Sequence, residues 1–200
     1  MEQLIISIGR ECGSGGHEIA EKLAGHYKLK LYDRNLLEEI AQERNLKHED
    51  LNKHEESYHN KLLYRTVKGM NSSPDHNVAQ LQFEYLKKKA NKGDSFVVVG
   101  RCSETVLKDN KNLISIFVLG DEKSKVARLM KEHNCDMKKA TEIMKDGDKR
   151  RKKYHNSHCE IKWGDSRNYD ISINACRIGV DEAVRILIDF IDTRRKKCEM

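Results

Sequence analysis

Residues 5–23 constrain the fold more than any other part of the sequence. An apolar run at residues 5–8 is typical of a buried strand, four glycines follow within residues 9–16, and a helical pattern begins at Ile19. A glycine-rich turn between a strand and a helix lets backbone N–H groups converge on a phosphate at the positive end of the helix dipole. A tight turn without a ligand is the alternative, but four glycines exceed what turning the chain requires. The segment therefore predicts a strand, a phosphate-binding loop and a helix.

Further strands and helices alternate along the chain. Strong strand patterns cover residues 4–8, 95–99 and 113–119, and weaker ones cover residues 30–32 and 170–173. Helices are expected to begin at Asp121, Asp136 and Asp181, because an acidic residue precedes each helical pattern. Parallel strands need crossover connections, which are usually helical, so this alternation predicts an α/β fold with a parallel sheet covered on both faces.

Composition restricts the class of partner and the compartment. The formal charge of +6 and the pI near 8.9 favour anionic partners, either nucleotides or nucleic acid. Six cysteines occur without a CxxC pair and no leader precedes the first strand, which favours reduced thiols in the cytoplasm. The apolar runs are far shorter than the roughly 20 residues that a membrane-spanning helix needs. We expect a cytoplasmic protein with no membrane segment.

The loop departs from the Walker pattern GxxxxGK[ST]. Gly16 and His17 stand where that pattern has its lysine and its hydroxyl residue. The positive charge for the phosphates must therefore come from elsewhere, and His17 either donates to phosphate when protonated or caps the helix. The residues expected to bind the donor phosphates are Arg10, Gly13, Ser14, Gly15, Gly16 and His17.

Four motifs give a specific resemblance that extends over nearly the whole chain. They are residues 9–19 (GRECGSGGHEI), 31–34 (LYDR), 98–102 (VVGRC) and 148–154 (DKRRKKY). Each is weak alone, but in this order and spacing they resemble the cytidylate kinase-like family. The resemblance implies a three-layer P-loop kinase fold with a five-stranded parallel sheet. The length predicts one domain over residues 1–200, and the resemblance implies a helical acceptor-binding region at 34–92 and a lid at 145–168.

The acceptor side is expected at the carboxyl ends of two strands. Asp33 and Arg34 follow the short strand at residues 30–32, and this is the edge where ligands bind in open α/β sheets. The resemblance implies that Asp33 orients the acceptor or a metal and that Arg34 holds the acceptor phosphate; alternatively, Asp33 is only a helix cap. Arg101 ends the strongest strand and would direct a bidentate donor at phosphate oxygens, unless it merely closes the strand at the surface.

The lid prediction depends on the basic run near residue 150. By resemblance, Arg150 and Arg151 neutralise charge on the transferring phosphoryl group, with Arg101 as a third catalytic arginine. A solvated basic helix is the alternative. Trp163 is expected to pack at the base of the lid rather than to stack on a nucleotide base.

Metal ligands are not indicated by spacing alone. His155, His158 and Cys159 lie close together in the sequence, but they lack a second matched ligand pair of the kind structural zinc sites use. No aspartate follows the strand at residues 95–99 in the manner of a Walker B carboxylate. Magnesium would then be held mainly by phosphates and water.

These expectations lead to a nucleoside monophosphate kinase that uses ATP and Mg²⁺ and acts on CMP, dCMP or a related monophosphate. A nucleotide-binding protein of the same fold with weak or no transfer is the alternative, because the Walker lysine is absent. A nucleic-acid binder fits less well, since the glycine-rich loop already accounts for an anion site. We expect nucleotide substrates as partners, no nucleic acid and no membrane; the sequence carries no signal for oligomeric state.

Overall fold

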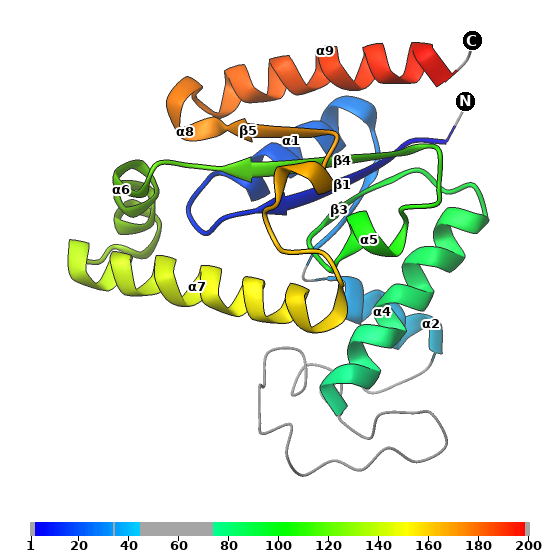
Figure 1. Ribbon diagram of the computed structural model, residues 1–200, viewed down its shortest axis with the longest axis horizontal. Helices are drawn as coiled ribbons and strands as arrows, with labels where there is room; N and C mark the ends of the chain where they lie inside the picture. The colour runs from blue at the N-terminus through cyan, green and yellow to red at the C-terminus, as the bar shows by residue number, and fades with distance from the viewer. Residues whose placement is uncertain (1–2, 34, 45–73, 199–200) are drawn as a thin grey trace.

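The protein has a central sheet with helices on both faces (Figure 1). The structure is a computed structural model, and it describes residues 3–33, 35–44 and 74–198. The strands are β1 (Ile5–Arg10), β2 (Lys30–Tyr32), β3 (Phe96–Val99), β4 (Leu113–Leu119) and β5 (Ile171–Asn174). The helices are α1 (Gly16–Tyr27), α2 (Leu36–Arg44), α4 (Pro74–Asn91), α5 (Ser103–Val106), α6 (Glu122–His133), α7 (Met137–His158), α8 (Ala175–Ile178) and α9 (Val180–Cys198), with a 3₁₀ turn at Ser166–Asn168.

The sheet has five parallel strands in the order β2-β3-β1-β4-β5. Ile8 near the end of β1 pairs with Val99 of β3 on one side and with Ile116 of β4 on the other. The chain therefore fills the sheet on one side of β1 and then crosses to its other side. The loop after β1 lies at this switch point, where open α/β sheets bind ligands. The five-stranded parallel sheet expected from the sequence is confirmed.

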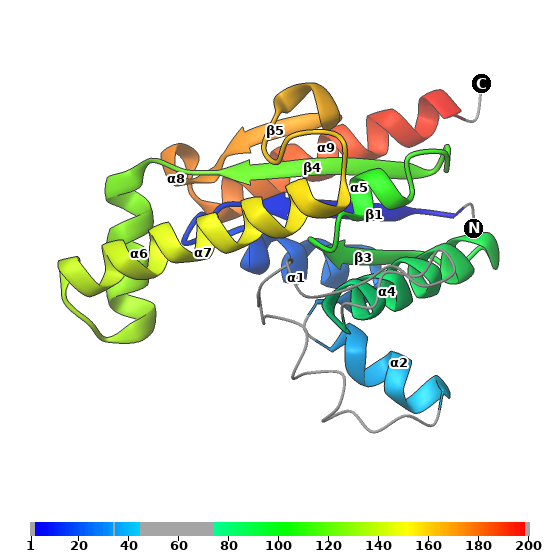
Figure 2. The ribbon, with the colours of Figure 1, turned by 60° about the horizontal axis from the view of Figure 1, so that its bottom comes forward.

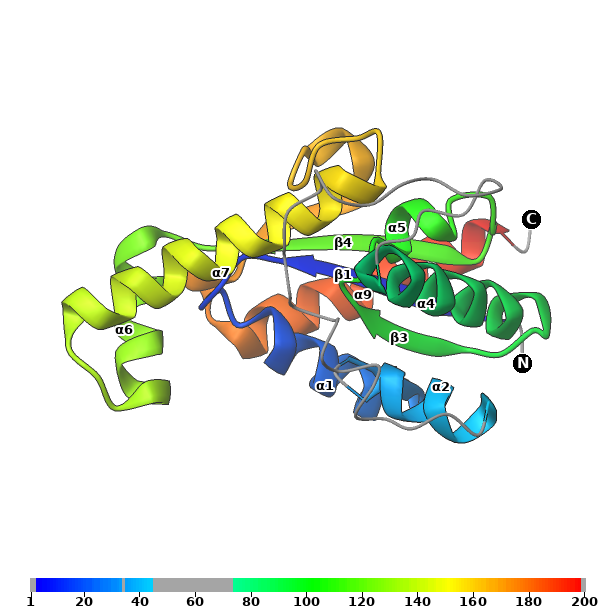
Figure 3. The same cartoon turned by 90° about the horizontal axis from the view of Figure 1, so that it is seen from below.

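The two faces of the sheet bury alternate residues of the same strands, as the period of a strand requires. Ile6 and Ile8 of β1 pack in one cluster with α1 and α9, whereas Ile5 packs in another with α2, α4 and residues near α5. Figures 1 and 3 show α9 on one face and α4, α5 and α7 on the other. Burial on both faces explains why these strands are continuous apolar runs in the sequence.

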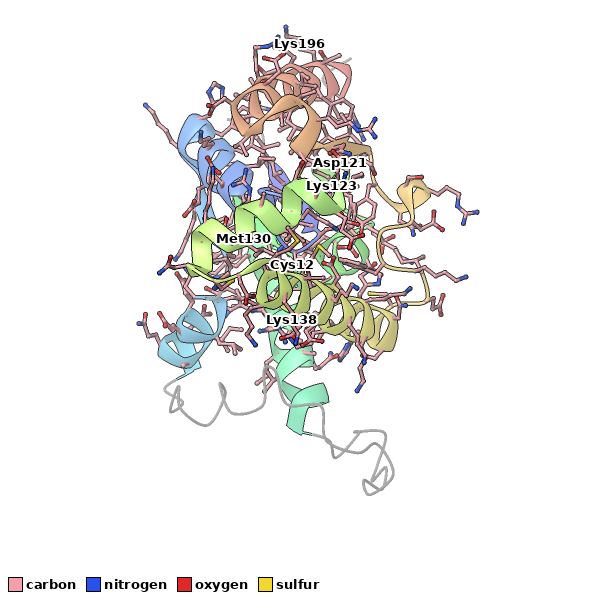
Figure 4. The ribbon with its side chains drawn as sticks, turned by 90° about the vertical axis from the view of Figure 1, so that its left-hand side faces the viewer. Cys12, Asp121, Lys123, Met130, Lys138 and Lys196 are labelled. Carbon is pink, nitrogen blue, oxygen red and sulfur yellow. The ribbon has the colours of Figure 1, made fainter. Side chains whose placement is uncertain are left out.

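A smaller apolar cluster lies beyond the sheet, under helices α6 and α7. It contains Cys12 of the glycine-rich loop together with Val126, Leu129, Ala140 and Met144. Figure 2 shows the α6–α7 pair at the carboxyl end of β4, and Figure 4 shows Cys12 between the two helices. This cluster fixes α6 and α7 against the loop.

Several predicted boundaries shift in the structure. β1 continues through Gly9 to Arg10, so Arg10 belongs to a strand rather than to the loop. The polar stretch at residues 58–77, which contains the only proline of the sequence, is typical of a loop. Residues 58–73 lie outside the described residues, but residues 74–77 already belong to α4. Proline is tolerated at the first position of a helix because its missing N–H has no partner there in any case, and Pro74 occupies that position.

The predicted lid is not a separate segment at its start. Residues 145–158 are the last 14 of the 22 residues of α7, a helix that begins after Asp136. The Oδ1 atom of Asp136 accepts a hydrogen bond of 2.7 Å from the Lys139 amide, so the expected helix start is confirmed. Trp163 packs edge-on against Phe117, with ring centroids 5.5 Å apart, which agrees with its expected packing role.

Candidate nucleotide-binding site

The loop between β1 and α1 leaves the start of α1 open to an anion. Gly13 and Gly15 have φ angles of 77° and 84°, in the left-handed region that glycine adopts without strain. Gly15 is the N-cap of α1, and no side chain forms a capping hydrogen bond there. The first amides of a helix have no partner within the helix, so those of Gly16 and His17 carry the positive end of the dipole.

The glycines also serve the packing of neighbouring elements against the loop. A Cβ atom at Gly13 would lie 2.8 Å from the carbonyl oxygen of Lys125, and one at Gly16 would lie 2.5 Å from Cβ of Arg10. Real Cβ atoms do not come this close to other heavy atoms, so side chains at these positions would displace the backbone of α6 or the end of β1. Close packing is therefore a reason for glycine at positions 13 and 16 that is separate from the binding of a ligand.

The side chain of Arg10 lies where a side chain at position 16 would begin. Its Cβ and Cγ atoms are 2.5 and 3.1 Å from the ideal Cβ position of Gly16. Its Nη1 atom is the nearest neighbour of the ideal Cβ position of Gly100, so the guanidinium reaches the turn after β3. A lysine at the first position of α1 is the usual cation of a P-loop. In this chain Arg10 takes the adjoining space and carries a permanent charge.

The turn after β3 has an uncommon backbone. Gly100, Arg101 and Cys102 have successive φ angles of 74°, 60° and 53°. For the two residues with side chains this conformation costs about 1–2 kcal/mol each. The turn is fixed from below, because Ser103 Oγ donates to the Gly100 carbonyl at 2.7 Å and lies 2.7 Å from Ser7 Oγ. Strain of this kind is often kept at binding sites, where it holds a side chain in one direction.

Helix α7 contacts the loop directly through a carboxylate. Asp148 Oδ1 accepts a hydrogen bond of 2.6 Å from the Cys12 amide. Gly147 allows this approach, because a Cβ atom there would lie 2.7 Å from Cys12 Sγ. One loop amide thus already holds an anionic group from the predicted lid.

Charges around Asp148 form a partly buried network. Lys125 Nζ lies 2.9 Å from Glu11 Oε2 and 3.5 Å from Asp148 Oδ2, while Arg151 Nη1 lies 3.8 Å from Asp148 Oδ1. Burial would lower the pKa of Lys125, but the hydrogen bond and charge of Glu11 outweigh it and raise that pKa. Burial raises the pKa of Asp148, and the Cys12 amide and Lys125 offset part of the rise. Lys125 therefore stays charged beside the loop.

The end of β2 meets the start of α1. Asp33 Oδ2 lies 3.6 Å from His17 Nε2, and the Asp33 carboxylate also accepts from the Asn35 amide at 3.2 Å. His17 is exposed and contacts Glu21 as well, at 3.5 Å. Arg34, the predicted acceptor-phosphate ligand, lies outside the described residues. The predicted donor and acceptor sides are thus adjacent at Asp33 and His17.

The remaining predicted residues occupy different positions. Ser14 is fully buried and its hydroxyl donates to the Glu11 carbonyl at 2.9 Å, so it contributes by holding the loop. Arg151 Nη1 is 3.5 Å from the Arg10 carbonyl, beside the loop, whereas Arg150 is exposed. Lys125 was not anticipated, because it stands on α6 among other lysines and nothing in the local sequence distinguishes it.

The fold is the one that P-loop-type kinases have. Shikimate kinase from Bacteroides thetaiotaomicron is 11% identical, with a TM-score of 0.56 over 94% of this chain and 98% of that one. A sugar kinase from Janibacter sp. HTCC2649 is 12% identical, with a TM-score of 0.54 over 95% of each chain. At these identities the likeness shows the fold.

Residues 5–176 match the cytidylate kinase-like family, and the chain belongs to that family. An uncharacterized protein from Eubacterium ventriosum is similar to it, with 43% identity and a TM-score of 0.76 over 95% of this chain and 99% of that one. No curated protein matches the sequence significantly. Family and fold together support a phosphotransferase. None of the described helices is both long enough and apolar enough to cross a membrane.

Proposed function

We propose that the protein transfers the γ-phosphoryl group of ATP, with Mg²⁺, to CMP, dCMP or a related nucleoside monophosphate. The observation that carries the proposal is Arg10, which lies over Gly16 at the uncapped start of α1. A permanent cation beside free helix amides is what the charged phosphates of ATP require. Membership of the cytidylate kinase-like family supports a pyrimidine monophosphate as acceptor.

On the donor side, the amides of Gly16 and His17 and the guanidinium of Arg10 would bind the β- and γ-phosphates. Arg151 would approach from α7, since it already lies within 3.5 Å of the Arg10 carbonyl. Together these groups would neutralise the charge that develops during phosphoryl transfer, which is the main demand of this chemistry.

On the acceptor side, Arg101 would bind the monophosphate and Asp33 would orient it. The left-handed turn at Gly100 and Arg101 supports this role, because it limits the directions that the arginine can take. The attacking phosphate oxygen is already anionic, so the reaction needs no general base. Catalysis would then consist of positioning and charge neutralisation.

Magnesium fits this site mainly through the phosphates. Glu11 and Asp148 are both paired with Lys125, and the Ser14 hydroxyl donates within the loop, so these groups are not directed at a metal. Asp33, at the end of β2, is the carboxylate that would hold the ion, directly or through water. When bound, Mg²⁺ supplies further neutralisation of the phosphate charge.

One observation favours a second candidate, a nucleotide-binding protein with weak or no transfer. Asp148 already satisfies the Cys12 amide, and its negative charge would repel phosphates in the loop. In this alternative ATP binds, but the lid carboxylate and the missing Walker lysine prevent fast transfer.

The two candidates differ in turnover. ADP release would be measured by a coupled enzyme assay with ATP and Mg²⁺ over a panel of nucleoside monophosphates, alongside ATP binding by calorimetry. Turnover with CMP or dCMP is expected, and Arg101→Ala should lower it while ATP still binds. ATP binding without turnover on any acceptor would rule out the kinase and leave the binding protein.

A further inference from the structure

We infer that Cys102, His155 and Cys159 form a zinc site that joins the end of α7 to the turn after β3. One ligand atom from each of the three residues lies within 4.8 Å of the other two. In a tetrahedral zinc site with thiolate and imidazole ligands, neighbouring ligand atoms are ~3.5–3.8 Å apart. Closing the group around an ion therefore needs a shift of only about 1 Å.

The three residues come from two elements that are distant in sequence. His155 is in the last turn of α7 and Cys159 is its C-cap, so the i, i+4 spacing places both on one side of the helix end. Cys102 precedes α5, immediately after Arg101. His158 is not part of this group; its ring packs against Tyr154, with the ring centroids 4.6 Å apart. The sequence pattern of His155, His158 and Cys159 therefore lacked Cys102, because spacing along the chain does not predict that Cys102 lies near the end of α7.

Glu104 supplies the support that a ligating histidine usually has. Its Oε1 atom lies 2.7 Å from Nε2 of His155, and both side chains are buried. Zinc-bound histidines typically bind a carboxylate in the outer shell, which fixes the ring and strengthens it as a ligand. A buried carboxylate beside a histidine and two thiols is thus an independent sign of a metal site.

The charges also fit a divalent ion. Two thiolates and a neutral imidazole would balance the charge of Zn²⁺, and water would complete the four-coordinate site. Cys102 and Cys159 are free thiols in the structure, and a metal, unlike a disulfide between them, would also use the adjacent histidine, which is why we favour the metal.

Such a site would hold the turn that carries Arg101 against the last turn of α7. Its existence does not depend on the proposed kinase activity, and binding can be measured without any nucleotide. The full-length protein, reduced and stripped with a chelator, would be titrated with Co²⁺, whose thiolate-to-metal charge-transfer absorption reports cysteine ligation. Zn²⁺ would then be added as competitor.

We expect a charge-transfer band that saturates at one Co²⁺ per chain and is abolished by one equivalent of Zn²⁺. Cys159→Ser should lose most of the band, whereas Cys135→Ser, at a similarly half-buried thiol outside the group, should keep it. Glu104→Gln should keep the band but weaken binding by about 10–100-fold. Zn²⁺ should also raise the Tm of the wild type and not that of Cys159→Ser.

Three results would overturn the inference. They are a wild type without the band, equal bands in Cys159→Ser and Cys135→Ser, and loss of two thiols to a disulfide under mild peroxide with no metal uptake. If Cys102→Ser does not fold, the variants Cys159→Ser and Glu104→Gln still test the inference. Circular dichroism can establish that these two variants are folded.

Discussion

Placing a lysine at position 16 tests whether Arg10 has taken over the place of the usual P-loop cation. The Cβ atom of Gly16→Lys would lie 2.5 Å from Cβ of Arg10 and 3.3 Å from Cβ of Val118. Neither neighbour is the flexible end of a side chain, so strands β1 and β4 would have to give way. Overpacking of this kind costs about 1–3 kcal/mol.

The matched control is Gly25→Lys in the same helix. A Cβ atom at Gly25 would meet nothing within 4 Å, and its backbone is not left-handed. Replacing glycine within a helix should stabilise the protein by about 0.5–1 kcal/mol. Chemical denaturation would measure both variants, and the difference between them isolates the clash with Arg10 from the effect of adding a lysine to α1.

The reciprocal pair Arg10→Gly with Gly16→Lys completes a double-mutant cycle. Removing the Arg10 side chain should relieve the clash. The double variant should therefore lose about 1–3 kcal/mol less free energy of unfolding than the losses of the two single variants added together. In the ADP-release assay, Arg10→Gly should lose about 100-fold in kcat, and the pair should recover part of that loss. If Gly16→Lys alone is as stable as the wild type and more active, Arg10 does not occupy the place of the P-loop lysine and the reasoning is refuted.

The other predictions concern the loop and the network beneath α7. Gly13→Ala should lower the free energy of unfolding by about 3 kcal/mol, because the new Cβ would be strained and 2.8 Å from the Lys125 carbonyl. Gly93→Ala, also left-handed but with open space, should cost only about 1 kcal/mol; equal losses in urea denaturation would contradict the packing argument. Asp148→Asn should tighten ATP binding about fivefold, or roughly 1 kcal/mol, by removing a charge that repels phosphate. Calorimetry would measure this, with the exposed Asp146→Asn as control, and weaker ATP binding in Asp148→Asn would show that the carboxylate helps to hold the ligand.

Much of the architecture follows from local sequence patterns. Strands β1, β3 and β4 were predictable because burial on both faces makes each a continuous apolar run. The glycine-rich loop was predictable because several glycines between a strand and a helix are typical of a turn that binds phosphate. The start of α4 at Pro74 was not, since a proline amid polar residues is equally typical of a loop.

The sequence by itself therefore determined the order of strands and helices, the place of the loop after β1, and the lack of a lysine in that loop. Only the tertiary structure decided which side chains surround the glycine-rich loop and the neighbouring turn after β3. Arg10 reaches across Gly16, Lys125 and Asp148 meet from two helices, and Cys102 lies beside His155 and Cys159. Periodicity reports which face of an element is buried, but contacts between residues far apart in the chain depend on how the sheet and helices pack together.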